Sequence, residues 1–282
     1  MKKYIFLLLS LIVFKVQAQN GNVFKVEYKS AHRYQMVSDF KIQLTGNLTG
    51  DTAIINKIKS QGIEQPINLN LDMALNIAVI TGKSNGVNGF PLIFTKDGAQ
   101  VSAEINGSNI PIPPNAEKKS TISAHVMQDG TYRIDSVRAT SLKDTSVKFI
   151  SQIINGLQHQ IRFPDHPLKI GESFTQEVPI VLPFTPSNNS IVIKVSYTLL
   201  KISEGNAYFE MVNDLNASLS LKNIMVNISG TGVGMMVYSL KDQFPTQYDN
   251  ELKINLDAFF MGIKATATGK LTTKNSCLIT IL

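Results

Sequence analysis

The chain has 282 residues, of which 43% are apolar and 17% charged, and it contains one Cys and no Trp. This length suffices for one large domain or two smaller ones, and the apolar fraction is that of a globular protein. A single Cys excludes a disulfide framework and any cysteine-rich metal site. The net charge of +6 falls to +3 when Lys2, Lys3 and Lys15 are set aside, and no dense basic cluster remains, so nucleic-acid binding is not expected.

The first 18 residues have the pattern of an export signal. Lys2-Lys3 precedes an almost entirely apolar run from Tyr4 to Val13, and Val16-Gln17-Ala18 places compact residues at the positions that a signal peptidase reads. We therefore expect residues 1–18 to be a signal peptide that is cleaved near Ala18. The mature chain is expected in the periplasm or outside the cell, without a transmembrane helix, because no later run of apolar residues is long enough.

The strongest signal in the mature chain is the alternation of apolar and polar residues with period two. It runs through residues 40–48, 67–80, 207–222 and 252–257. Such alternation places apolar side chains on one face of an antiparallel sheet and polar ones on the other. Residues 67–80 alone would form a strand of roughly 48 Å at about 3.4 Å per residue. The sequence therefore predicts a mainly β protein of long, curved antiparallel sheets, as a half-barrel or a two-lobed meander.

One main amphipathic helix interrupts this pattern. Apolar residues recur at helical spacing from Val147 to Ile161, and we expect the helix to run from Ser146 to His159, because Pro164 prevents its continuation. A second segment, Asp51 to Ser60, is compatible with either a helix or a strand. The predicted organisation is a first antiparallel half over 19–141, a helix and proline turn over 142–167, and a second antiparallel half over 168–282.

Several local motifs carry narrower expectations. Hairpin turns are expected at Asp97-Gly98, Asn106-Gly107, Asp129-Gly130 and Glu204-Gly205-Asn206. The spacing of Gly230, Gly232 and Gly234 indicates either a kink or bulge in a strand, or a face without side chains that admits a ligand. The run Phe259-Phe260-Met261 predicts a strand that is covered on both faces. Pro179 predicts an edge strand.

The sequence offers no recognisable catalytic, cofactor or metal site. It has four His, it lacks HExxH and GxSxG, and its one SxxK motif, Ser38 to Lys41, lacks the companion motifs of the enzymes that use it. We therefore expect a protein that is not an enzyme, with no catalytic residue, no metal and no cofactor. Cys277 is expected to be a buried, inert thiol, the alternative being an intermolecular disulfide.

A resemblance appears where the predicted helix meets the second half. The stretch from Phe163-Pro164 through Lys169 to Gly171-Glu172-Ser173-Phe174 resembles uncharacterised secreted β-proteins of Bacteroidetes, in which a Gly-acid-Ser-aromatic step opens a long antiparallel meander. This loose likeness covers about half the chain, and Phe174 stands where such proteins often have Trp. It implies architecture and export, and no activity. At the level of fold, the pattern is also similar to the periplasmic lipoprotein carriers and their half-barrels.

Our leading hypothesis is an exported β-protein that binds a lipid, an acyl chain or another envelope component in an apolar cavity or groove. The expected lining comprises Leu71, Met73, Leu75, Ile77, Ile150, Ile154, Leu157, Phe209, Met211 and Leu219. The alternative is a structural or protein-interaction module of the cell envelope, in which the same side chains form a fully packed core. A third reading is an outer-membrane barrel, against which stand the internal helix, the absence of Trp and the C-terminal Leu282.

Overall fold

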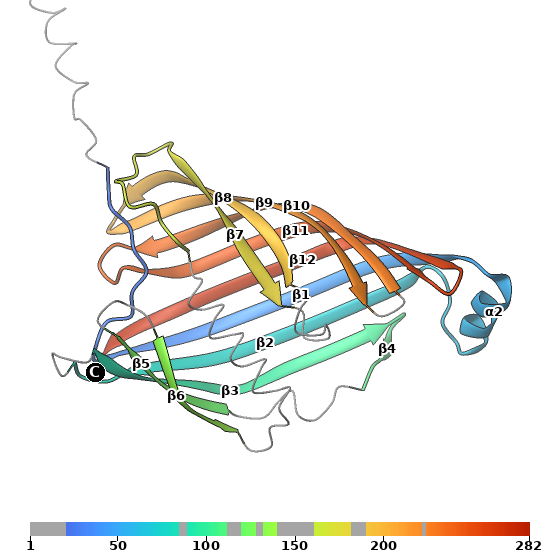
Figure 1. Cartoon of the computed structure of the whole chain (residues 1–282), viewed down its shortest axis with the longest axis horizontal. Helices are drawn as coiled ribbons and strands as arrows, with labels where there is room; N and C mark the ends of the chain where they lie inside the picture. The colour runs from blue at the N-terminus through green and yellow to red at the C-terminus, as the bar shows by residue number, and fades with distance from the viewer. Residues whose placement is uncertain are drawn as a thin grey trace, which may run out of the picture.

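The computed structural model describes residues 21–84, 89–111, 120–127, 132–139, 161–181, 190–221 and 224–282. Within them the chain forms one curved antiparallel sheet of twelve strands with the form of a half-barrel (Figure 1). The predicted helix over Ser146–His159, with Ile150, Ile154 and Leu157, lies outside the described residues. The expected turn at Asp129-Gly130 also lies outside them.

The strands follow one another along the sheet almost as they do along the chain. They are β1 (His32–Gly50), β2 (Ile67–Thr81), β3 (Phe90–Ile105), β4 (Ser108–Asn109), β5 (Ser120–Val126), β6 (Tyr132–Ala139), β7 (Ser173–Val181), β8 (Ser190–Ser203), β9 (Asn206–Leu221), β10 (Ile224–Ser239), β11 (Phe244–Phe260) and β12 (Ile263–Ile281). Their order in the sheet is β6-β5-β3-β2-β1-β12-β11-β10-β9-β8-β7, and β4 pairs with β3 alone. The two edges are therefore β6 and β7, and Pro179 lies on an edge strand, as predicted.

The two halves of the chain meet where the first long strand pairs with the last. All 19 residues of β1 have partners on β12, from His32 opposite Ile281 to Gly50 opposite Ile263. Residues 19–141 supply β1 to β6, and residues 168–282 supply β7 to β12. The halves thus form a single sheet, and not two lobes.

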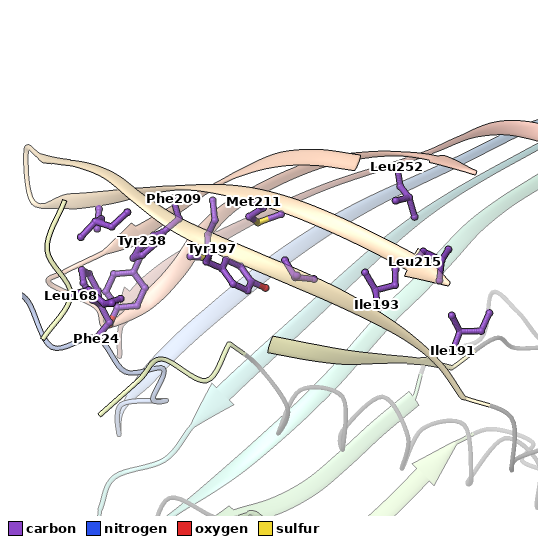
Figure 2. Close-up of a cluster of buried hydrophobic side chains, with 14 of the residues drawn as sticks. Phe24, Leu168, Ile191, Ile193, Tyr197, Phe209, Met211, Leu215, Tyr238 and Leu252 are labelled. Carbon is purple, nitrogen blue, oxygen red and sulfur yellow. The ribbon is translucent and has the colours of Figure 1, made fainter. Parts of the chain in front are cut away.

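The register gives the sheet two chemically different faces. Paired residues point to the same side of the sheet, so the pairings can be followed from strand to strand. They place Tyr34, Val79 and Phe94 of the first half on the same face as Phe209, Met236 and Leu252 of the second half. We call this the apolar face and its opposite the polar face. Figure 2 shows side chains of the apolar face gathered on the concave side of the sheet.

Two neighbouring hydrophobic clusters, both packed against Val26 of the N-terminal segment, cover part of the apolar face. Phe24 packs against Phe209 and Tyr238, with ring centroids 5.2 and 5.3 Å apart, in a cluster that also contains Leu168 (Figure 2). Tyr28 packs against Tyr34 and Phe244 in a second cluster on β1 to β5. Such aromatic pairs each add about 0.5–1.5 kcal/mol beyond their buried area.

The undecided segment at Asp51–Ser60 is a helix, α2 (Thr52–Ser60). The Asp51 carboxylate accepts hydrogen bonds from the amides of Ala53 and Ile54, which satisfies donors at the helix start. The helix lies beyond one end of the sheet and buries none of its residues (Figure 1). Its apolar residues therefore do not anchor it to the described core.

Two other local expectations are wrong. Asp97-Gly98 forms no hairpin turn, because β3 continues through it and the pairing with β2 shifts there between Leu75 and Ile77. A β-bulge and a hairpin use the same turn-forming residues, so the sequence signal is shared. Phe259 and Met261 are 45% and 79% exposed, so β11 is not covered on both faces. The turns at Asn106-Gly107 and Glu204-Gly205 are confirmed by positive φ angles.

The junction of β1 and β12 offers a direct test of the sheet. A Cβ at Gly269 would overlap the main-chain carbonyl oxygen of Gln43 on β1. We expect Gly269→Ala to lower the free energy of unfolding by roughly 2–3 kcal/mol in urea titrations, because the two strands must separate to admit it. Thr268→Ala, the neighbouring change on the polar face, should cost less than about 0.5 kcal/mol. Equal stability of both variants would contradict this register.

Candidate functional site

The described residues of the predicted lining all lie on the apolar face, in two groups. Leu71, Met73, Leu75 and Ile77 line β2, and their side chains are half-buried. Phe209, Met211 and Leu219 line β9 and are at most 6% exposed. Four strands separate β2 from β9, so at about 4.8 Å per strand the groups are roughly 24 Å apart along the sheet. The β9 group is part of the packed core, whereas the β2 group remains accessible.

The accessible part of the apolar face extends from β3 to β12. One row of directly opposed residues crosses five strands and is apolar throughout: Ala103, Leu71, Ile42, Leu271 and Leu252. The three central members of this row are half-buried, although they belong to central strands of the sheet. Contiguous apolar surface of this kind is typical of a binding surface.

Charge is confined almost entirely to the polar face. Among the strand residues whose side chains are described, the apolar face carries no Asp, Glu or Arg, and its basic groups are Lys96 on β3 and His32 at the start of β1. Burial lowers the pKa of Lys96. Ion pairs such as Lys41–Asp72 and Lys270–Glu251 lie on the polar face. A ligand on the apolar face would therefore meet few charges.

The three spaced glycines of β10 do not form the expected kink or bulge. The register of β10 is regular through Gly230, Gly232 and Gly234, and it shifts only later, between Val237 and Tyr238. Gly232 faces Asn213 of β9, and Gly234 faces Asn250 of β11. The side chains of Asn213 and Asn250 meet across β10, where Asn213 Nδ2 donates to Asn250 Oδ1 at 2.8 Å. A Cβ at Gly234 would lie only 3.0 Å from Asn250 Oδ1.

Asn213 and Asn250 belong to a larger group of polar side chains on the apolar face. Asn250 is directly opposite Thr273 of β12, and Tyr248 is directly opposite Asn275, which in turn faces Ser38 of β1. We call these side chains the polar cluster: Ser38, Asn213, Tyr248, Asn250, Thr273 and Asn275. Asn213, Thr273 and Asn250 are only 2%, 8% and 9% exposed, so these amides and hydroxyls are held within apolar surroundings.

One atom of the polar cluster has no hydrogen-bond partner among the described residues. The Asn275 Oδ1 atom is buried, and no donor reaches it there. A buried acceptor without a donor costs about 1–3 kcal/mol. Buried polar groups are nearly always hydrogen-bonded, so an acceptor of this kind needs an explanation, such as a bound water or another bound group.

Several buried tyrosines surround this region. Burial raises the pKa of Tyr248 to about 12, and it also raises the pKa of Tyr197, which the nearby Tyr248 raises further. Figure 2 shows the Tyr197 ring extending from β8 beneath the arch of strands. Burial likewise raises the pKa of Tyr238 to about 12, although its hydroxyl donates to the Lys25 carbonyl oxygen, which lowers the pKa. All these hydroxyls are therefore neutral at ordinary pH.

Two hollows lie on the sheet among the described residues, and both are lined mainly from the polar face. The larger, of about 540 Å³, includes the Lys41–Asp72 ion pair together with Met73 and Ala74. The second, of about 510 Å³, is lined by residues such as Gln43, Asn70 and Lys270. Neither hollow is the apolar cavity that the sequence led us to expect.

The remaining reactive groups do not form a site. Cys277 is a free, half-buried thiol on β12, and burial raises its pKa to about 12, which disfavours the thiolate at ordinary pH. His125 and Asp135 form a hydrogen bond near the β6 edge, and this bond lowers the pKa of the Asp135 carboxyl. In the described part of the chain, no three His, Cys, Asp or Glu side chains gather closely enough to hold a metal ion.

Comparisons with known proteins add little to this geometry. No protein-family model matches the sequence, and no curated protein matches it either. Among solved structures, the chain is similar to the translocator domain of the autotransporter NalP from Neisseria meningitidis, at 10% identity over 86% of this chain and 87% of that one. The TM-score is 0.17, so this likeness supports no conclusion about function. Within the described ranges, no helix has the length and apolar character needed to cross a membrane.

Sequence reasoning missed the polar cluster, although a signal for it was present. Asn213 occupies an apolar position of the alternation between Met211 and Leu215, and Asn250 occupies the same phase as Leu252. A polar residue in the apolar phase of a strand is unusual, and two of them indicate a buried pair. Their contact could not be predicted, because it depends on the register of three strands.

The contact between the two asparagines predicts a coupled loss of stability. Asn250→Leu should lower the free energy of unfolding by about 1–3 kcal/mol, since it leaves the buried Asn213 amide without its acceptor. Adding Asn213→Leu should cost less than the sum of the single changes, with a coupling of at least about 0.5 kcal/mol in a double-mutant cycle. Asn255→Leu, on the polar face of β11, is the matched control. Additive effects would show that the pair contributes nothing.

The buried tyrosines predict a loss of stability in alkali. Because their folded pKa values are raised above the ordinary value of about 10, the stability that they contribute is complete below pH 10 and is lost as the pH rises towards 12. In that range, the ionisation of each tyrosine should make the free energy of unfolding fall by up to about 1.4 kcal/mol for each unit that the pH rises. Urea titrations of the wild type and of Tyr238→Phe/Tyr248→Phe measure this effect. An equal pH dependence in both proteins would contradict it.

Proposed function

We propose that this chain is an exported, non-enzymatic protein that holds the acyl chain of a lipid against its apolar face. The observation that carries the proposal is the half-buried apolar row across β1, β2 and β12, with Leu71, Ile42 and Leu271 directly opposed. Burial of apolar surface contributes about 25 cal/mol per Å², so an acyl chain along this row would bind without any specific polar contact.

The shape and stability of the sheet support the same proposal. A concave surface on long strands presents a row of apolar side chains to one side, and two hydrophobic clusters pack on the same face. The accessible stretch from β12 to β3 spans three strand spacings, or roughly 14 Å. This width is comparable to an extended dodecyl chain. Export follows from the expected signal peptide over residues 1–18.

A structural or protein-interaction module of the cell envelope is the second candidate. It is favoured by the complete burial of Phe209, Met211 and Met236, which form an ordinary core over β9 and β10. In this case the accessible apolar row would pack against another protein rather than a lipid. The two candidates differ in whether the isolated chain takes up small apolar molecules.

Binding of a neutral naphthylamine probe tests the proposal. Met73→Trp fills the apolar face of β2, and we expect it to weaken binding of N-phenyl-1-naphthylamine by at least about tenfold, which is about 1.4 kcal/mol. Ala74→Trp places the same bulk on the polar face of the same strand and should leave the affinity within about twofold. Met211 is unsuitable for this test, because it is fully buried and a Trp there would disrupt the core.

The two Trp variants also show on which face of the sheet the ligand binds. Ala74 and Met73 both border the larger hollow, but Ala74 points to the polar face. If Ala74→Trp abolished binding and Met73→Trp did not, the ligand would lie in the hollow of the polar face. If the wild type bound no probe, the structural module would be favoured.

A further inference from the structure

The polar cluster lies beside the accessible apolar row, within the same few strands. Along one line of opposed residues, Val101, Met73 and Phe40 are apolar, and the next two, Thr273 and Asn250, are polar. The neighbouring line likewise changes from Leu75 to Ser38, Asn275 and Tyr248. The apolar face therefore has an amphiphilic pattern, with hydrocarbon contacts over β2 and β3 and hydrogen-bonding groups over β11 and β12.

We propose that the polar cluster binds the uncharged head of a neutral acyl lipid, such as a glycerol ester, whose chain lies over β1, β2 and β3. This inference rests on the proposed function, because it assigns the head group of the same ligand. Amides and hydroxyls donate to an ester carbonyl and accept from a glycerol hydroxyl. The buried Asn275 Oδ1, which no described residue satisfies, is the acceptor expected to receive such a hydroxyl.

The described strand residues around the cluster carry no formal charge, which selects against an ionised head. Among the described strand residues, no Asp, Glu or Arg shares this face, and Lys96 is separated from β12 by β1 and β2. Tyr248 and Tyr197 keep their protons, since burial raises the pKa of each. A carboxylate or phosphate placed here would lose its hydration without gaining an opposite charge, which is strongly unfavourable.

The polar cluster also has the rigidity that recognition requires. Asn213 is 2% exposed, and its side-chain amide donates a hydrogen bond to the Asn250 side-chain oxygen. This bond crosses β10 at Gly232 and Gly234. This bond uses the Asn250 side-chain oxygen as its acceptor and does not occupy the N–H donors of the Asn250 amide. The glycines thus allow a fixed pair of amides to stand where most strands would carry apolar side chains.

The test compares three twelve-carbon compounds as competitors of the naphthylamine probe: 1-monododecanoylglycerol, dodecanoate and dodecane. We expect the glycerol ester to bind the wild-type chain at least about tenfold more tightly than dodecanoate at pH 8. Lowering the pH to 5 should strengthen the binding of dodecanoate, as its carboxylate gains protons, and leave the ester unchanged. Equal affinities for the ester and dodecanoate at pH 8, or no preference for the ester over dodecane, would overturn the inference.

Variants connect this preference to the polar cluster. Asn275→Leu and Asn250→Leu should each reduce the affinity for the ester by about fivefold or more and leave that for dodecane unchanged. Asn255→Leu on the polar face should change neither. An equal loss for ester and dodecane would mean a purely structural role. If the wild type bound none of the three compounds, the proposed function would fail as well, whereas binding without preference would remove only the assignment of the head group.

Discussion

The pairing of β1 with β12 is the interaction on which the rest of this sheet depends. It joins segments from opposite ends of the sequence over 19 residues, and it places six strands from each half of the chain in one sheet. Because side chains alternate with period two, a slip of one residue at this junction would turn the apolar positions of one half to the polar face. The junction therefore fixes both the fold and the continuity of the apolar face.

The apolar face has a packed part and an accessible part. Phe24, Leu168 and the aromatic side chains around Phe209 form one cluster, and Tyr28 packs against Tyr34 and Phe244 in a neighbouring one. Leu71 and Ile42 lie eight residues further along β2 and β1 than Val79 and Tyr34, and they remain half-buried on these central strands. An ordinary core would bury such residues, so the proposed ligand binding rests on this accessible row. Leu71, Ile42 and Leu271 line neither of the two hollows described above.

Much of the sheet was predictable from the alternation alone. Ile67, Leu69 and Leu71 show that β2 has one apolar face, and Asn206 after Glu204-Gly205 marks the turn between β8 and β9. The Asp97-Gly98 turn was misassigned, because a bulge within β3 uses the same residues as a hairpin. The pairing of β1 with β12 could not be predicted, since alternation fixes the face of each strand but not its neighbour.

One part of the candidate site could likewise be predicted from the sequence, and the other part could not. The apolar lining on β2 follows from period two, whereas the polar cluster forms only when residues of four separate strands, β1, β9, β11 and β12, come together. The contact between Asn213 and Asn250 also requires glycines at positions 232 and 234, which by themselves indicate a kink as readily as a close approach. Long-range register is therefore the information that the residue pattern lacked.

Native mass spectrometry of the chain, exported by a bacterial host and purified from its periplasm, tests the central claim most directly. The account predicts a stoichiometric mass above that of the polypeptide, which organic solvent extracts as a neutral acyl lipid. A polypeptide that carries no added mass, even after incubation with a saturating mixture of neutral lipids, would contradict it. The accessible row on β1, β2 and β12 would then have to be explained by contact with another protein.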